Sequence, residues 1–177
     1  LNQVVNPGFA NRNLFCVLIG SNRHANLPDE RELYSERVKA IRWFEANAAK
    51  DFALFGSGWL VPQKRLSKSG KWRYRLEKVL PFLLGNAVFP SYKGSAQNKF
   101  EVLAKARFCI CYENAKDISG YITEKIFDSL FAGCVPIYWG EPRIQDIVPQ
   151  TCFIDFRLFL SAADPYRDLH QYLSKMT

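Results

Sequence analysis

Residues Tyr112–Gly140, YENAKDISGYITEKIFDSLFAGCVPIYWG, contain the pattern that decides the fold. A polar loop leads into a helix expected over Thr123–Phe131, where apolar side chains recur at steps of three and four residues. Gly133 follows at the point where a left-handed helix cap suits a residue without a side chain. Apolar runs on either side, RFCICYE at 107–113 and CVPIYW at 134–139, are typical of buried strands. The stretch therefore predicts a strand, helix and strand of a parallel sheet.

The same alternation of strands and helices extends toward both ends of the chain. Further strands are expected at residues 14–20, 51–55 and 152–156, and further helices at residues 30–48, 97–106 and 165–176. Such an order predicts an α/β fold, a Rossmann-like parallel sheet with helices on both faces and ligands at the carboxyl ends of its strands. We expect residues 1–177 to form a single domain, and the region 60–95 shows no clear element.

Composition and charge limit the classes of partner. The chain has 177 residues, of which 48% are hydrophobic, so it can bury one sizeable core. A formal charge of +7 favours anionic partners such as nucleotides, phosphorylated glycans, nucleic acid or a membrane surface. The segment Lys64–Lys78 has seven basic residues, with Trp72 and Tyr74 among them. It is either a solvated surface or a contact with an anionic acceptor, lipid headgroups or nucleic acid.

The cysteines and the missing targeting signals bear on location. The chain has five cysteines, four of them within apolar runs, which indicates buried free thiols in a reducing compartment: Cys16, Cys109, Cys111, Cys134 and Cys152. The sequence has no N-glycosylation acceptor, no apolar run of membrane-spanning length and no signal-peptide pattern at its start. We expect a cytoplasmic protein, and because the chain begins at Leu1 we expect it to be a fragment of a longer one.

Glu124 and Lys125 place unlike charges in the first turn of the expected helix after Thr123, a suitable N-cap. A helix start attracts anions, and Lys125 adds a full positive charge, whereas Glu124 would repel a phosphate. A nucleotide sugar satisfies both residues, because its diphosphate suits the lysine and its hydroxyl groups suit the carboxylate. The alternative is purely structural, since an acid stabilises any first turn and a neighbouring lysine can point to solvent. Likewise, Tyr121 could be a packing residue and Asn114 the cap of a turn.

Four segments together resemble glycosyltransferase family 10, the α-1,3/1,4-fucosyltransferases. The segments are GSNRHANLPDERELYSERVKAIRWF at 20–44, FALFGSGW at 52–59, FCICYENAKDISGYITEKIFDSLFAGCVPIYWG at 108–140 and CFIDFRLF at 152–159. The likeness is strongest over Lys99–Phe159 and weakest over Leu60–Tyr92. It implies a GDP-fucose-dependent inverting transferase of the two-lobed GT-B type, with this chain as its C-terminal, donor-binding lobe.

The resemblance also implies roles for five residues. Arg37 and Lys125 would hold the pyrophosphate, with Tyr121 and Asn114 nearby, and Glu124 would bind ribose or fucose hydroxyl groups. The family often has Phe where Tyr112 stands, and its loop before Tyr121 varies in length, so Asn114 is placed less firmly than the Glu-Lys pair. The catalytic base would be a carboxylate of the N-terminal lobe. We therefore expect the isolated chain to bind GDP or GDP-fucose but to transfer little.

No cofactor is expected, and no metal-binding motif is visible in the sequence. A divalent cation such as Mn²⁺, if one takes part, would meet the diphosphate rather than a built cage. The expected partners are GDP-fucose and a glycan acceptor, with peripheral association at the inner face of a bacterial membrane and without nucleic acid. Two alternatives remain, namely a related transferase that uses another nucleotide sugar and a non-catalytic module that binds anions or nucleic acid.

Overall fold

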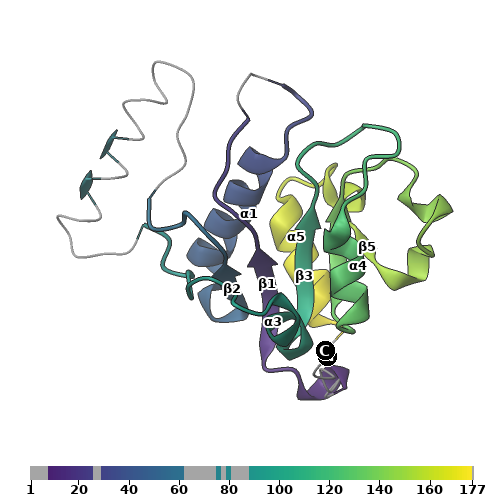
Figure 1. Cartoon of the computed structure of the whole chain (residues 1–177), viewed down its shortest axis with the longest axis horizontal. Coiled ribbons are helices and arrows are strands. Elements are labelled where there is room, and N and C mark those ends of the chain that lie inside the picture. The colour runs from purple at the N-terminus through teal and green to yellow at the C-terminus, as the bar shows by residue number, and fades with distance from the viewer. Residues whose placement is uncertain (1–7, 26–28, 62–74, 77–78, 81–87, 177) are drawn as a thin grey trace.

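The computed structural model describes residues 8–25, 29–61, 75–76, 79–80 and 88–176. Five parallel strands form one sheet in the order β2-β1-β3-β4-β5, and Figure 1 shows helices packed along it. The strands are β1 (Leu14–Ile19), β2 (Phe52–Phe55), β3 (Ala106–Tyr112), β4 (Val135–Trp139) and β5 (Ile154–Asp155). The main helices are α1 (Tyr34–Asn47), α3 (Lys99–Lys105), α4 (Glu124–Phe131) and α5 (Pro165–Ser174). The predicted α/β fold is confirmed.

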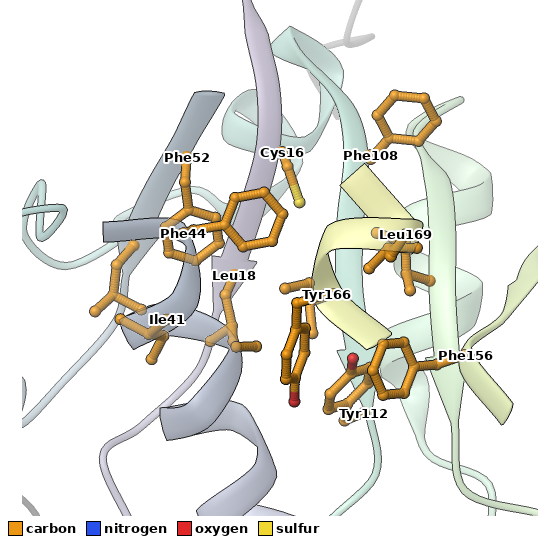
Figure 2. Packing of buried hydrophobic residues seen from close by; sticks show 14 of the residues in the cluster. Cys16, Leu18, Ile41, Phe44, Phe52, Phe108, Tyr112, Phe156, Tyr166 and Leu169 are labelled. Atoms are coloured by element: carbon orange, nitrogen blue, oxygen red, sulfur yellow. The ribbon is translucent and has the colours of Figure 1, made fainter. Parts of the chain in front are cut away.

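Alternate residues along each strand divide the core between the two faces of the sheet, as strand geometry requires. One cluster joins Cys16 and Leu18 of β1 to α1 and α5, and Figure 2 shows this packing around Phe44 and Tyr166. The other cluster joins Val17 of β1 to α3 and α4. Helices therefore cover both faces, which explains why the strands are nearly continuous apolar runs.

Stacked and edge-on aromatic rings fill the face under α1 and α5. Phe44 of α1 stacks on Phe52 of β2 with ring centroids 4.9 Å apart. Phe156 stacks on Tyr166 of α5 at 5.1 Å, and its ring also contacts Tyr112 of β3 at 5.1 Å (Figure 2). These contacts pack α1 on the start of β2 and connect α5, through Phe156, to the carboxyl end of β3.

Two elements differ most from the sequence prediction, and the other bounds agree within about two residues. Helix α1 begins at Tyr34 rather than near Glu30. The Glu32 carboxylate, just before the helix, accepts a hydrogen bond from the Ser35 amide of the first turn at 3.0 Å. Strand β5 has two residues rather than five, because the Asp155 carboxylate caps a 3₁₀ turn over Phe156–Phe159 and ends the extended segment.

The cysteines and the end of α4 agree with the prediction. All five cysteines are free thiols; four are buried, and Cys152 is exposed. Burial raises the pKa of the Cys16 thiol well above the ordinary value, and a hydrogen bond with Cys111 together with burial does the same for the pKa of the Cys109 thiol. Gly133, after α4, has a φ of 67°, the left-handed conformation that the sequence predicted for this position.

Candidate functional site

The carboxyl edge of the sheet contains a cavity of about 270 Å³ between β1 and β3. From β1 the sheet continues to β2 on one side and to β3 on the other, so the strand order reverses there, and open α/β sheets bind ligands at such a point. The arrowheads of β1 and β3 in Figure 1 point toward this edge. The cavity is lined by Leu18, Ile19, Gly20, Ser21, Arg23, Tyr34, Arg37, Ile110, Tyr112, Asn114, Glu124 and Lys125.

Four of the five predicted site residues line this one cavity: Arg37, Asn114, Glu124 and Lys125. Tyr121 joins them through a hydrogen bond of 3.0 Å, which the Asn114 amide donates to the Tyr121 hydroxyl. Residues that are far apart in the sequence are brought together because α1 and α4 both begin at the carboxyl edge of the sheet.

Arg37 lies one turn inside α1 and is buried, with 7% of its surface exposed. Its Nη2 atom donates to the Tyr112 carbonyl oxygen at 2.8 Å and to Asn114 Oδ1 at 2.8 Å. Burial lowers the pKa of the Arg37 guanidinium, and the negative charge of neighbours such as Glu113 opposes this shift. An arginine keeps its proton under such conditions, so Arg37 brings a fixed positive charge to the cavity wall.

Asn114 connects the arginine to the tyrosine. Its carbonyl oxygen accepts from Arg37 and its amide nitrogen donates to Tyr121, so both ends of the side chain are engaged. Its backbone oxygen also accepts from the Leu33 amide at 2.9 Å, just before α1. Asn114 therefore holds α1 to the loop after β3 while its side chain orients two other predicted site residues.

Lys125 is held by a buried carboxylate that the sequence analysis did not predict. Glu113 is fully buried, and its Oε2 atom lies 3.0 Å from the Lys125 ammonium. The Lys125 side chain keeps 23% of its surface exposed at the cavity. The position of Glu113, directly after a buried strand and before Asn114, was the available signal, since a charged residue there must find partners.

The start of α4 is capped differently from the prediction. Thr123 is the N-cap, but its side chain makes no capping hydrogen bond to the helix. Its hydroxyl donates to Glu113 Oε2 at 2.7 Å and accepts from Lys125 Nζ at 2.7 Å, and its amide donates to Glu113 Oε1 at 2.8 Å. The Glu113 carboxylate therefore satisfies a donor of the helix entrance.

Glu124 lies between two cavities. The second cavity, of about 170 Å³, lies on the α3 and α4 side of the sheet and shares Ile19, Ile110, Glu124 and Lys125 with the first. Its wall also includes the ion pair of Lys99 and Asp128. A carboxylate in this position can accept hydrogen bonds from hydroxyl groups of a ligand that reaches from one cavity into the other.

Other predictions concern residues or properties beyond this cavity. The basic segment 64–78 lies almost entirely outside the described residues, so its role stays a prediction. Across residues 8–25, 29–61 and 88–176, no group of three His, Cys, Asp or Glu side chains is placed to hold a metal ion. Within the same part of the chain, no helix has both the length and the apolar character that a membrane crossing needs.

Comparisons with known proteins agree with this fold. A family model described as glycosyltransferase family 10 (fucosyltransferase), C-terminal, matches residues 58–177. The chain is 36% identical over 101 residues to an alpha-(1,3)-fucosyltransferase, FucT, of Helicobacter pylori, which covers 55% of this chain and 21% of the relative. It is 32% identical over 80 residues to GDP-fucose protein O-fucosyltransferase 3 of Danio rerio, covering 45% of this chain and 17% of the relative.

Solved structures show the same architecture. A crystal structure of an alpha1,3-fucosyltransferase matches 96% of this chain and 36% of that chain, with a TM-score of 0.59 and 21% identity. A crystal structure of an alpha1,3-fucosyltransferase with GDP-fucose matches 92% of this chain and 34% of that chain, with a TM-score of 0.56 and 19% identity. The chain thus spans about a third of these structures and about a fifth of the curated relatives.

Proposed function

The chain belongs to glycosyltransferase family 10, and from this premise we propose that it is the donor-binding lobe of a two-lobed fucosyltransferase that uses GDP-fucose. The observation that carries the proposal is the convergence of Arg37 of α1 and Lys125 of α4 on one cavity at the switch point of the sheet. Two cations from different elements suit a diphosphate, which offers acceptor oxygens on two phosphorus atoms.

In this proposal Arg37 and Lys125 hold the pyrophosphate throughout the reaction. The acceptor hydroxyl oxygen forms a bond to the fucose anomeric carbon, the bond from that carbon to the GDP oxygen breaks, and the electron pair leaves with GDP. The two cations stabilise the charge that develops on the leaving diphosphate. The proton of the acceptor hydroxyl passes to a base, which we place in an N-terminal lobe outside this chain.

Glu124 takes the sugar side of the donor. Glu124 and Lys125 both line the two cavities, and a carboxylate accepts hydrogen bonds whereas an ammonium only donates them. We therefore assign the ribose or fucose hydroxyl groups to Glu124 and the phosphates to Lys125. Tyr121 and Asn114 complete the proposed donor site. Asn114 contributes chiefly by orienting Arg37 and Tyr121, since both ends of its amide are engaged with them.

The residues at the cavity do not fit a built metal site. Three of its lining side chains are cationic, namely Arg23, Arg37 and Lys125, and Glu124 is the carboxylate among them. Hard divalent cations bind several oxygen ligands, and Mg²⁺ or Ca²⁺ sites depend on carboxylates. The positive charge that the diphosphate needs is supplied by the protein, so no step of the proposed reaction passes through a metal.

We also propose a glycan acceptor and a cytoplasmic location, with peripheral association at the inner face of a bacterial membrane. The acceptor follows from the family, and the location is supported by five free thiols, four of them buried. A vesicle flotation assay tests the membrane proposal. Binding to anionic vesicles should fall as the salt concentration rises, and salt-insensitive binding or none would contradict it.

Calorimetry with GDP, UDP and CMP tests the donor. GDP should bind with a dissociation constant at least about tenfold below those of UDP and CMP, and GDP at 100 times its dissociation constant should stabilise the fold by about 2.7 kcal/mol. Lys125→Met should weaken GDP binding, whereas Lys105→Met, which removes the same charge from an exposed position on α3, should not. Tighter binding of UDP or CMP would instead support a related transferase, and no binding by the folded protein would refute the proposal.

A further inference from the structure

We infer that Glu113, together with Thr123, is a positioning residue that holds the Lys125 ammonium at the cavity; the inference rests on the proposed function. Glu113 does not line the cavity itself, since its side chain is fully buried behind Lys125. Its action on a ligand would therefore pass through the lysine. The reasons lie in burial, hydrogen-bond geometry and the shape of the neighbouring backbone.

Complete burial of a carboxylate has a high cost unless the charge is paired and hydrogen-bonded. Glu113 meets this condition with three donors, which are the Thr123 amide at 2.8 Å, the Thr123 hydroxyl at 2.7 Å and the Lys125 ammonium at 3.0 Å. All three belong to the entrance of α4. The carboxylate thus fixes the start of the helix and the lysine in a single cluster.

The geometry leaves Lys125 partly available. An ammonium has three donors, of which one points to Glu113 and one to the Thr123 hydroxyl, so one remains for a ligand in the cavity. A lysine without such partners samples many rotamers on its four-carbon stem. Two fixed bonds remove most of this freedom before a diphosphate arrives, which is how preorganisation raises affinity.

Gly140, directly after β4, leaves the space that the Glu113 side chain occupies. A Cβ atom built on Gly140 would lie 2.5 Å from Glu113 Cγ and 2.9 Å from Glu113 Cβ, well inside van der Waals contact. The Glu113 amide donates to the Trp139 carbonyl oxygen at 2.8 Å, so the backbone at Glu113 is also joined to the last residue of β4. Two segments, one after β3 and one after β4, are therefore shaped around this carboxylate.

A purely structural role for Glu113 makes a different prediction. If the carboxylate only stabilises the start of α4, its loss should weaken the fold and affect every ligand alike. If it positions Lys125, its loss should affect ligands that have a diphosphate and should depend on the presence of the lysine. A double-mutant cycle separates these two cases, because residues that act through one another are not additive.

The experiment compares Glu113→Gln, Lys125→Met and the double variant with the parent protein, using calorimetric titration with GDP and with guanosine. Glu113→Gln should weaken GDP binding about tenfold and change guanosine binding less than twofold. In the Lys125→Met background it should change GDP binding less than twofold. Glu101→Gln, on the exposed face of α3, is the matched control and should bind GDP as the parent does.

Two results would overturn the inference while the proposed function stands. One is a folded Glu113→Gln protein with unchanged or tighter GDP binding, and the other is an equal loss with and without Lys125. A parent protein that binds no GDP would refute the proposed function and the inference with it. Circular dichroism and urea unfolding show whether each variant is folded.

Thr123 supplies a second test if Glu113→Gln does not fold. Thr123→Ala keeps the ion pair of Glu113 and Lys125 but removes the hydroxyl that accepts from the ammonium. GDP affinity should fall about threefold, guanosine affinity should be unchanged, and Thr123→Ser should restore GDP binding because it keeps the hydroxyl. Parent-like binding by Thr123→Ala, or failure of Thr123→Ser to restore it, would overturn the inference.

Discussion

Two arginines lie at opposite ends of the same parallel sheet, and both are almost fully buried, with 2% of Arg12 and 7% of Arg37 exposed. Arg12 precedes β1 and donates to the carbonyl oxygens of Leu103 at 2.8 Å, Ala106 at 2.8 Å and Ala132 at 2.7 Å. These carbonyls belong to the carboxyl ends of α3 and α4, where a helix has acceptors without partners and a partial negative charge.

Arg37 has a different environment at the carboxyl edge. Its hydrogen bonds to Tyr112 and Asn114 both start from Nη2, and its side chain lines the cavity. Arg12 thus completes two helix ends, whereas Arg37 is held at one side and faces a space that a ligand can fill. A buried arginine marks a candidate binding site only where its donors face a cavity, and this difference can be tested by removing each arginine in turn.

Removal of Arg12 should have the largest effect, and this effect should be on stability. Arg12→Met removes the guanidinium donor from three buried backbone carbonyls, of which that of Leu103 also accepts from the Ala106 amide. Each buried polar group that is left unsatisfied costs about 1–3 kcal/mol. We expect the free energy of unfolding, measured by urea titration, to fall by about 4 kcal/mol. GDP affinity of the folded fraction should stay within about twofold of the parent value, because Arg12 does not line the cavity.

Lys105→Met is the matched control for this variant, since it removes one positive charge from an exposed position on the same helix that Arg12 caps. It should change stability by less than about 0.5 kcal/mol. A loss below about 1 kcal/mol for Arg12→Met would contradict the structural role of Arg12 and weaken the contrast between the two ends of the sheet.

Removal of Arg37 should instead weaken ligand binding. Arg37→Met takes one of the two proposed diphosphate cations out of the cavity, and charge-assisted hydrogen bonds of this kind are strong. We expect calorimetry to show a loss in GDP affinity of about 100-fold, or about 2.7 kcal/mol. Guanosine should lose much less, because it has no phosphate for Arg37 to bind.

Lys39→Met, on the exposed side of α1, controls for the loss of one charge from that helix; 64% of its side chain is exposed. It should bind GDP within about twofold of the parent. If Arg37→Met keeps its affinity within threefold and loses only stability, Arg37 would be a structural residue like Arg12, and the contrast would disappear.

The fold was largely predictable because its signals are local. Apolar runs without alternation indicated strands buried on both faces. Apolar residues at helical spacing between these runs indicated helices that cover the two faces of the sheet, as the two core clusters confirm. The shorter β5 was not predictable from apolar spacing, because the Asp155 side chain ends the strand by capping the next turn. The start of α1 was missed for a similar reason, since the Glu32 side chain sets it.

The site was predictable only in part. Glu124 and Lys125 could be identified from charge at a helix start, and Arg37 only from a family resemblance, because a helical arginine is usually exposed. Glu113 was missed although its partners, Thr123 and Lys125, follow within twelve residues. Arg12 was missed because its burial depends on partners from distant segments. For Arg12 these partners are backbone carbonyls, which no sequence pattern identifies.

At alkaline pH we expect a smaller effect on stability, which comes from the end of the sheet that contains Arg12. Cys134 directly precedes β4, at the same end of the sheet as Arg12, and burial raises the pKa of its thiol to about 12, although the charge of Arg12 opposes the shift. A thiol in the unfolded chain titrates near pH 8.5, so the unfolded state loses this proton first. The contribution of the protonated Cys134 thiol to the free energy of unfolding is complete below about pH 8.5. It is lost as the pH rises toward 12, by up to about 1.4 kcal/mol per pH unit.

Cys134→Ala should therefore flatten the decline of the free energy of unfolding between about pH 9 and pH 10.5, as measured by urea titration at each pH. Cys152→Ala, at the exposed cysteine, is the matched control and should follow the parent curve. Equal slopes for the parent and Cys134→Ala would mean that the thiol meets solvent in the native state. The packing around Arg12 would then be looser than its three carbonyl contacts require, and the end of the sheet that we assign to stability would be the more mobile one.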